Sequence, residues 1–391
     1  MPVNLQLCIS QKENTKPYKF KITGINVYSF EEALFHCHHY WKQSIDDFLS
    51  NEFIDWVGSA LDLAYIASKI KALSKLSKIS LSLAAFLSLT DYFSDQEIEK
   101  LKKEIFIWEN RNEWEKLKER GDFLMNSNNP ERACNYYKKA LEYDENAEIL
   151  NNIAISLMKT GNYGEARKYL RRAGSIKPRD FALMTHLAEA CILDGDFDAA
   201  QVMLKDIKDV FGNKDEIYYY NGEICFHQGN YSEAVYYYEK IISADIEQDT
   251  DYIYRLSEAY GKLGYYEKAL GVLENINMRG KYFYKKQAEL YAEAENFSAA
   301  AKFIERALDM DKNSVALRIK LAMYHRMNCD YARAEAAIAK AFELSPQNPH
   351  ANLEDALIKK SLGRLKEYQT ILHEILESFT TSYRFNEAEI N

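Results

Sequence analysis

The chain has 391 residues, of which 47% are hydrophobic and 28% charged, and its formal net charge is −9. A chain of this size can bury a large core, and the negative charge excludes nucleic-acid binding through bulk electrostatics. The first twenty residues show no basic segment followed by an apolar stretch, so we expect no signal peptide. Six irregularly spaced cysteines are typical of packing thiols in a reducing compartment. The sequence therefore predicts a cytoplasmic protein without a transmembrane segment.

Residues 1–112 are predicted to form a separate, mainly helical domain that caps the rest of the chain. Apolar residues alternate over 3–9 and again over 18–22, which indicates a small antiparallel hairpin. Ser29 and Glu32 have the spacing of a capping box, so we expect a helix over 29–49. Further helices are expected at the following places: 52–73, 76–92 and 95–120, the last running directly into the next part of the chain.

A histidine-rich cluster in the first predicted helix raises the question of a metal site: His36, Cys37, His38 and His39. His36 and His39 would lie on neighbouring helical turns while the other two point elsewhere, so one helix supplies at most two convergent ligands. Cys8 and Asp46 are the conceivable additions. Because the spacing matches no metal motif, we expect no metal and no other cofactor, with the histidines packed against Tyr40 and Trp41.

A basic stretch precedes an apolar one in the same domain, with lysines at 69, 71, 75 and 78 followed by apolar residues from 79. The apolar run is far shorter than the roughly 20 residues that cross a bilayer. Two interpretations remain: a basic amphipathic helix at a membrane surface, or lysines on the solvated face of a helix pair. We favour the second. The sequence also lacks a glycine-rich phosphate loop, a nucleophile elbow and paired metal-ligand motifs, so we expect no enzyme and no catalytic residue.

From residue 113 onwards, an alanine returns at steps of 33, 34, 34, 35, 31 and 34 residues: Ala133, Ala166, Ala200, Ala234, Ala269, Ala300 and Ala334. A period near 34 with a small residue at a fixed phase is typical of paired helices that stack into a solenoid. If this alanine is position 20 of the unit, position 8 is always small, and position 15 is often glycine, which suits a left-handed helix stop. Position 17 is aromatic in six copies, and position 32 is proline in two (Pro178 and Pro346).

These residues resemble the tetratricopeptide repeat (TPR) family, of bacterial type. The resemblance covers 113–378, with seven copies and a degenerate eighth as C-terminal cap, and it leaves 379–391 as a tail. It implies an all-α fold: a right-handed superhelix of helix-turn-helix repeats preceded by the small helical domain with its hairpin. The first copy has no glycine at position 15 and the sixth is shortened near 277–283, which are expected places of irregularity.

In TPR proteins the first helix of each repeat lines the inner surface, so the resemblance implies that positions 2, 5, 6, 9, 12 and 13 face a partner. Position 9 is acidic in most copies, and tyrosines lie at positions 5 and 6. The candidate partner-binding residues are Asn152, Glu189, Tyr219, Tyr220, Glu223, Tyr254, Glu258 and Glu289. Carboxylates beside tyrosines would hold a peptide that carries Lys or Arg. Alternatively, each glutamate pairs with a base of the next repeat, as Glu223 with Arg255 or Glu258 with Lys286. Both interpretations stay open.

The resemblance also allows a test for the clamp with which TPR co-chaperones bind a C-terminal carboxylate. Lys118 and Asn152 match its pattern, but Asp122 replaces an asparagine, and Ala182 and His186 replace two bases, so we expect no such clamp. We therefore expect a non-catalytic scaffold that binds a protein or peptide in its groove. The alternative is a peptide-sensing regulator of a response-regulator protein, because bacterial proteins of the Rap type also join a small helical domain to about seven TPR units.

Overall fold

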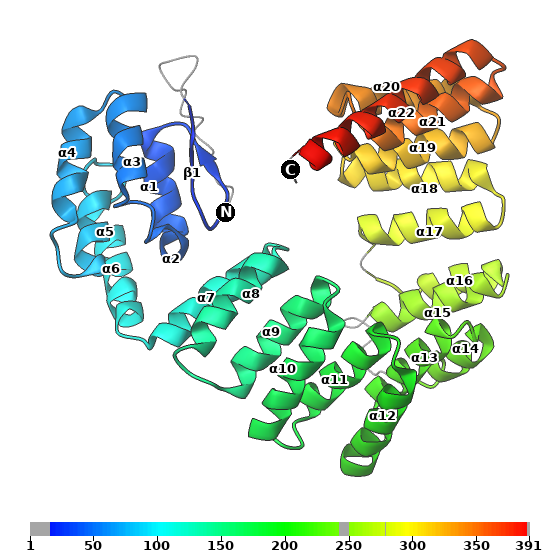
Figure 1. Cartoon of the computed structure of the whole chain (residues 1–391), viewed down its shortest axis with the longest axis horizontal. Helices are drawn as coiled ribbons and strands as arrows, with labels where there is room; N and C mark the ends of the chain where they lie inside the picture. Colours follow the sequence, from blue (N-terminus) through cyan, green and yellow to red (C-terminus); the bar gives the residue numbers. More distant parts are fainter. Residues whose placement is uncertain (1–15, 242–249, 278, 389–391) are drawn as a thin grey trace. The chain divides into compact units, whose positions relative to one another are not determined.

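The structure is a computed structural model that describes residues 16–241, 250–277 and 279–388, with side chains up to residue 376. The chain folds as two compact units, Met1–Met203 and Leu204–Asn391. Within the described ranges it is helical apart from one two-stranded hairpin (Figure 1). No helix in these ranges is long and apolar enough to cross a membrane.

The N-terminal part of the first unit contains the hairpin and a layer of short helices. Its elements are β1 (Tyr18–Lys19), β2 (Asn26–Val27), α1 (Phe30–His39), α2 (Trp41–Ser44), α3 (Asn51–Asp55), the π-helical turn η1 (Trp56–Ala60), α4 (Ala64–Leu73), α5 (Ile79–Leu87) and α6 (Asp95–Glu109). The two strands are antiparallel, with Tyr18 opposite Val27. Fully buried phenylalanines pack them onto the helices, at positions 20, 48, 53 and 86.

The predicted hairpin is confirmed, but its second strand is β2, which the sequence analysis did not assign; residues 3–9 lie outside the described part of the chain. The predicted helix over 29–49 is wrong beyond His39, because Tyr40 leaves the helical conformation at φ −116° and ψ 37°. Ser29 does cap α1 by accepting from the Glu32 N–H, whereas the Glu32 carboxylate accepts from the N–H of Tyr28 instead of closing a capping box on Ser29.

The other predicted N-terminal helices are also interrupted. Asp62 adopts a left-handed φ of 61° and separates η1 from α4, so the helix expected over 52–73 is two segments. The helix expected over 95–120 ends at Glu109, and a new helix begins after the N-cap Asn112. α5 is shorter at both ends than the expected 76–92. At the end of α6 the Asn110 side chain donates to the carbonyl group of Phe106 at 2.7 Å, a local hydrogen bond that the apolar periodicity does not register.

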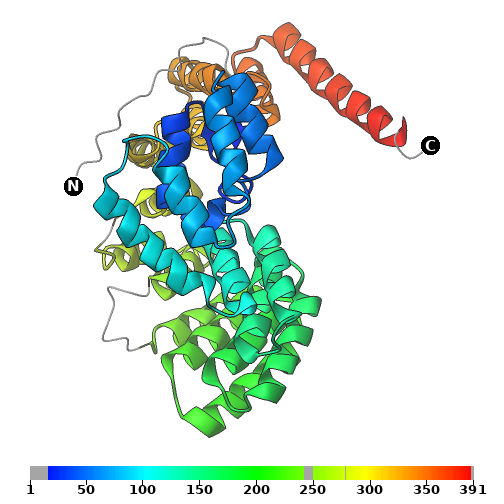
Figure 2. The same cartoon turned by 90° about the vertical axis from the view of Figure 1, so that its left-hand side faces the viewer.

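Eight helix pairs follow, each with a first (A) and a second (B) helix. They are α7 (Glu113–Asn126) and α8 (Pro130–Leu141); α9 (Ala147–Lys159) and α10 (Tyr163–Ile176); α11 (Phe181–Leu193) and α12 (Phe197–Phe211); α13 (Asp215–His227) and α14 (Tyr231–Tyr238); α15 (Asp251–Lys262) and α16 (Tyr266–Leu273); α17 (Lys281–Glu293) and α18 (Phe297–Met310); α19 (Val315–Met327) and α20 (Tyr331–Leu344); α21 (Pro349–Ser361) and α22 (Leu365–Ala388). The boundary between the units falls inside α12. α22, red in Figure 2, is one unbroken helix that continues past residue 378.

The repeat phases have the structural roles that their residue types predict. All seven position-20 alanines are completely buried. The six position-17 aromatic residues each begin a B helix, from Tyr163 in α10 to Tyr331 in α20. Every position-15 glycine has φ between 74° and 81°, and the non-glycine residues at this position follow: Asn128, Glu295 and Cys329 have φ of 55°, 58° and 61°. The turn geometry is therefore kept where the glycine is missing.

The first repeat is joined to the N-terminal helices by specific contacts within the first unit. Ile22, beyond β1, is buried in the apolar cluster of the first repeats. Arg132 of α8 donates to the carbonyl groups of residues 21 and 22, and Arg120 of α7 pairs with Asp46 at 2.7 Å. The Trp108 indole N–H donates to Glu119, which also pairs with Lys42. These contacts cover the first helix pair with the hairpin and α6.

Candidate functional site

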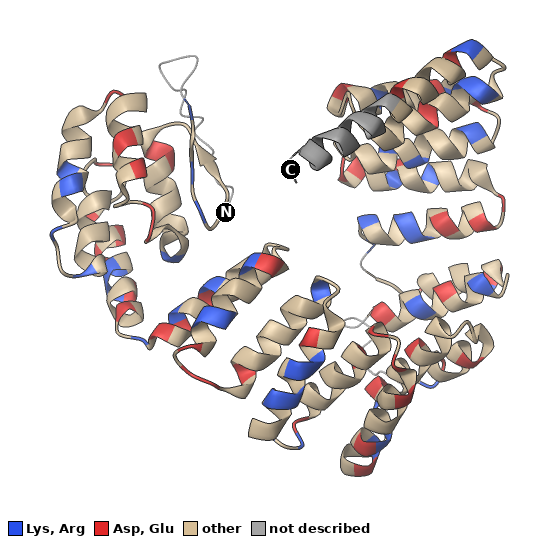
Figure 3. Ribbon diagram, in the orientation of Figure 1, with Lys and Arg blue, Asp and Glu red and all other residues tan. Residues whose placement is uncertain are grey.

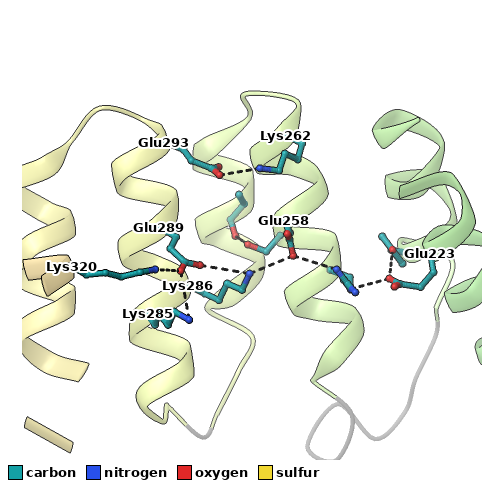
Figure 4. A network of polar contacts seen from close by, with 12 residues as sticks. Glu223, Glu258, Lys262, Lys285, Lys286, Glu289, Glu293 and Lys320 are labelled. Atoms are coloured by element: carbon teal, nitrogen blue, oxygen red, sulfur yellow. Dashed lines mark hydrogen bonds and ion pairs between the residues drawn. The ribbon is translucent and has the colours of Figure 1, made fainter. Parts of the chain in front are cut away.

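The A helices of the second unit carry a ladder of alternating charges, made of Glu223, Arg255, Glu258, Lys286, Glu289 and Lys320 (Figure 4). Arg255 Nε lies 3.1 Å from Glu223, Lys286 Nζ lies 3.4 Å from Glu258, and Lys320 Nζ lies 2.6 Å from Glu289. In each case a position-9 carboxylate meets the position-6 base of the next repeat. The pairing recurs because each repeat stacks on the next, which places the same positions of successive A helices near one another.

The ladder bears directly on the two interpretations that the sequence left open. Pairing between neighbouring repeats is present at Glu223, Glu258 and Glu289, and Lys285 adds a further base 3.9 Å from Glu289. Lys262 of α15 pairs with Glu293 of α17, which lies one helical turn beyond Glu289. The position-9 carboxylates of the second unit therefore form an acidic row in the sequence, but their charges are neutralised in the fold, because bases of the following repeat lie between them.

Glu223 is the most enclosed member of the ladder, with a side chain only 8% exposed. The Tyr238 hydroxyl donates to it at 2.6 Å, and burial together with the Glu223 charge raises the pKa of Tyr238 well above its usual value. Burial likewise raises the pKa of Tyr219, whose ring packs edge-on against Tyr220 at 5.4 Å between centroids. These groups form one buried network in α13, α14 and α15, so Glu223 has a structural role whatever else it contacts.

A cavity of about 400 Å³ opens beside the ladder, between the A helices α15, α17 and α19. Its apolar lining comes largely from Tyr254, Leu290, Phe297, Met323, Tyr324 and Met327, while Glu258, Lys286, Glu289 and Glu293 supply charged groups. Burial raises the pKa of Tyr324 to about 12, and the charges of Glu289 and Glu293 act in the same direction. Of the predicted residues, Tyr254, Glu258 and Glu289 thus lie together around one cavity.

Sequence reasoning missed the methionines of this cavity and one base of the ladder. Met323 and Met327 are positions 9 and 13 of the seventh repeat, and Lys320 is its position 6. All three positions belong to the inner surface that the TPR resemblance implies. The acidic row ends at Glu289, and position 9 of the seventh repeat is the apolar Met323, so the acidic pattern does not extend to these residues.

The remaining predicted residues lie elsewhere. Tyr219, Tyr220 and Glu223 are in the second unit but do not line the cavity. Asn152 and Glu189 are in the first unit, on α9 and α11. Asn152 donates to Asp122 at 3.4 Å, and that carboxylate also accepts from the Tyr137 hydroxyl and pairs with Lys118. Lys118 further contacts Glu148 at 3.0 Å.

The contacts of Lys118 explain why the carboxylate clamp would fail. Its ammonium already lies within 3.0 Å of the Asp122 and Glu148 carboxylates, so an incoming carboxylate would meet negative charge. His186, which stands where the clamp needs a base, contacts Asn151 through Nδ1 at 2.8 Å, and its burial lowers its pKa. The same region cannot supply the cationic surface that the clamp requires.

The N-terminal histidines pack against aromatic rings, including the expected contact of His36 with Tyr40, and the rings of His38 and His39 lie 4.8 Å apart. His36 is buried, stacks on Phe20 with centroids 3.6 Å apart, and hydrogen-bonds to Thr23 and Ser44. His38 stacks on Phe93 and His39 on Phe35, while the Cys37 thiol is fully enclosed. Asp46 is engaged by Arg120, and Cys8 lies outside the described residues. Over the described chain, no three His, Cys, Asp or Glu side chains converge as metal ligands.

Profiles of the tetratricopeptide repeat match residues 119–180, 157–220, 215–247 and 285–349. These segments contain six of the seven buried position-20 alanines, whereas Ala269 of the fifth helix pair lies between the matched segments. The chain is a tetratricopeptide repeat protein. TPR arrays are scaffolds for protein–protein interaction, because stacked repeats present a continuous surface to a partner.

Two curated relatives of this TPR protein match over more than half of its length. A TPR repeat-containing protein of Methanocaldococcus jannaschii is 24% identical over 250 residues, which are 63% of this chain and 41% of that protein. The human protein O-mannosyl-transferase TMTC3 is 24% identical over 242 residues, 59% of this chain and 26% of that protein. The chain thus spans less than half the length of these relatives.

Among solved structures, the C-terminal part of a TPR repeat-containing protein from Cytophaga hutchinsonii is similar to this TPR protein. It has 21% sequence identity and a TM-score of 0.40, and the match covers 60% of this chain and 97% of that one.

Proposed function

We propose that this TPR protein is a non-catalytic scaffold whose second unit binds a segment of a protein partner along α15, α17 and α19. The observation that carries the proposal is the cavity of about 400 Å³ between these helices. Its volume lies in the range of sites that enclose a ligand group, and its lining is mainly aromatic and aliphatic. An apolar side chain of the partner would enter it while the partner backbone follows the inner surface.

The charge ladder limits the role of partner charge. Glu258 and Glu289 already contact Lys286 and Lys320, so a partner Lys or Arg would have to displace a base of the protein itself. Exchanging one partly exposed ion pair for another of the same kind yields little free energy, because the gain of the new pair is offset by the loss of the old one. The apolar anchor is therefore the main source of affinity, and a Lys or Arg beside it adds selectivity through Glu258 or Glu289.

The two methionines suit a site that adapts to the side chain it receives. Methionine has three rotatable bonds and a polarisable sulfur, and it packs against varied shapes at low cost. Met327 is 43% exposed at the edge of the cavity, while Met323 is half-buried within it. We expect Leu, Met or Phe as the anchor.

The test uses peptides selected from a displayed random library on the wild-type protein and then titrated by fluorescence anisotropy. Met327→Trp obstructs the cavity from an exposed position, so it should lower affinity at least tenfold without unfolding the protein. Met310→Trp is the matched control, because Met310 is an exposed methionine of α18 that does not line the cavity. Equal affinity of wild type and Met327→Trp would refute the cavity as the anchor.

The regulator of the Rap type rests on shared architecture alone, so we do not propose it here.

A further inference from the structure

One end of the N-terminal helices combines unpaired lysines with exposed apolar side chains. This basic apolar patch is made of Lys71, Lys75, Leu76, Lys78, Leu81, Phe106 and Ile107. It comprises the end of α4, the loop to α5, the start of α5 and the end of α6. Between Asp62 and Asp91 the sequence contains four lysines and no acidic residue, in a chain whose net charge is −9.

Hydrogen bonds and a cation–π contact bring these segments together, and the Ser82 hydroxyl of α5 donates to the carbonyl group of Leu73 at the end of α4 at 3.3 Å. Lys78 Nζ lies 4.9 Å from the centre of the Phe106 ring, and the Glu109 carboxylate accepts from the N–H of Ile79 at 2.8 Å and from the Ser80 hydroxyl at 2.9 Å. The start of α5 is therefore held against the end of α6. Figure 3 marks the basic residues on α4 and the loop that follows it.

The lysines of the patch differ from those of the repeats. In the second unit Lys286 and Lys320 are held by carboxylates, whereas Lys71, Lys75 and Lys78 are exposed and have no carboxylate within ion-pair distance in the described part of the chain. Glu109, the acidic group beside Lys78, is occupied with the backbone and hydroxyl donors at the start of α5.

The apolar members of the patch are exposed side chains. Ile107 is 63% exposed, Phe106 47%, and Leu76 and Leu81 each 41%. Ala67 and Ile70 of α4 face the core, so α4 is amphipathic with its lysines outward. Single exposed apolar residues are common on protein surfaces, but a group of them beside uncompensated positive charge points to a binding surface.

We propose that the basic apolar patch docks on an anionic lipid surface. Its lysines would pair with lipid phosphates while Leu76, Phe106 and Ile107 enter the interface between headgroups and acyl chains. Charge complementarity selects this partner, because it offers negative charge and an apolar layer directly beneath it. A nucleic acid would satisfy the lysines but leave the apolar side chains in water. The inference is independent of the cavity in the second unit.

The experiment is co-sedimentation of the full chain with vesicles of phosphatidylcholine, with and without phosphatidylglycerol. We expect binding to the anionic vesicles only. The variant Lys71→Gln/Lys75→Gln/Lys78→Gln should bind the anionic vesicles roughly 100-fold more weakly, because each lysine near such a surface raises the binding affinity about fivefold. Leu76→Ser/Ile107→Ser should also weaken binding, which a purely electrostatic attraction would not show.

The matched control removes the same charge elsewhere: Lys159→Gln/Lys177→Gln/Lys208→Gln, all exposed lysines of the repeats. Its binding to anionic vesicles should equal that of the wild type. Absence of wild-type binding, equal losses in the two triple variants, or unchanged binding of Leu76→Ser/Ile107→Ser would each overturn the proposal. Binding to RNA with an affinity equal to that for anionic vesicles would overturn it as well.

Discussion

A methyl group added at Gly222 should destabilise the second unit. Gly222 is position 8 of the fourth repeat, and a Cβ built there lies 2.4 Å, 2.7 Å and 2.9 Å from three ring atoms of Tyr238, at position 24. The ring is fully buried and held by its hydroxyl on Glu223, so it cannot move aside freely. Overpacking of this kind lowers the free energy of unfolding by about 3 kcal/mol, and the better helix propensity of alanine raises it by about 1 kcal/mol. The expected net loss is about 2 kcal/mol.

The chain itself provides a rescue. Glycine at position 8 occurs with tyrosine at position 24 in the first and fourth repeats, whereas alanine or serine at position 8 occurs with leucine or isoleucine at position 24 in the second, third, fifth, sixth and seventh. The double variant Gly222→Ala/Tyr238→Leu should therefore regain part of the lost stability. The rescue is incomplete because Glu223 loses the tyrosine hydroxyl.

The assay is hydrogen exchange of α13 and α14, read by mass spectrometry, together with urea unfolding of the full chain. Gly271→Ala is the control, since the Cβ added in α16 would meet no atom of the described neighbouring residues within 4 Å. It should leave protection unchanged or increase it. If Gly222→Ala is as stable as Gly271→Ala, the packing argument for position 8 is wrong.

Three further changes have expected outcomes. Arg255→Met should lower the free energy of unfolding, measured with urea, by about 2–3 kcal/mol, because it leaves the buried Glu223 carboxylate without its base. The loss is somewhat smaller than for a fully buried pair, since Arg255 is one-third exposed. The double variant Arg255→Met/Glu223→Gln should recover much of the lost stability, and equal instability of the single and double variants would contradict this. Glu295→Gly and Cys329→Gly should each raise stability by about 1 kcal/mol, because both residues occupy left-handed turns, and unchanged urea midpoints would count against strain there. Burial lowers the pKa of His36 to about 4, so the unfolded state binds the proton more readily than the folded state. The free energy of unfolding should therefore fall by up to about 3 kcal/mol as the pH drops from 6.5 towards 4. In a His36→Gln variant the free energy of unfolding should depend less on pH, and identical pH profiles of the two proteins would refute the assignment.

The repeat fold could be predicted almost completely, because its signals are local and recur seven times. A buried alanine, a left-handed turn and an aromatic helix start each have one physical cause, and the phase of one copy supports the others. The turn even persists without glycine at Asn128, Glu295 and Cys329, which a search for glycine alone cannot find. There the geometry of the neighbouring repeats overrides the local preference.

The N-terminal elements and the candidate site were harder to predict for a different reason. The breaks at Tyr40 and Asp62 are changes of backbone conformation at single residues, so apolar periodicity merged segments that these residues separate. Likewise, the acidic row could be read from the sequence, but compensation by Lys320 depends on the offset between repeats. The cavity is a property of three helices at once and has no counterpart in any single segment.

The lengths of the B helices have a consequence for where the array opens. α14 and α16 have 8 residues each, whereas α8, α10, α18 and α20 have 12 to 14. In a stacked array stability is a sum of nearest-neighbour terms, and two short helices in succession contribute less packing, so we expect this part of the second unit to open locally at low cost. Leu273 at the end of α16 also lines the cavity. A partner bound in the cavity would contact this part of the array and disfavour its local opening. Binding would therefore reduce the mobility of the neighbouring repeats.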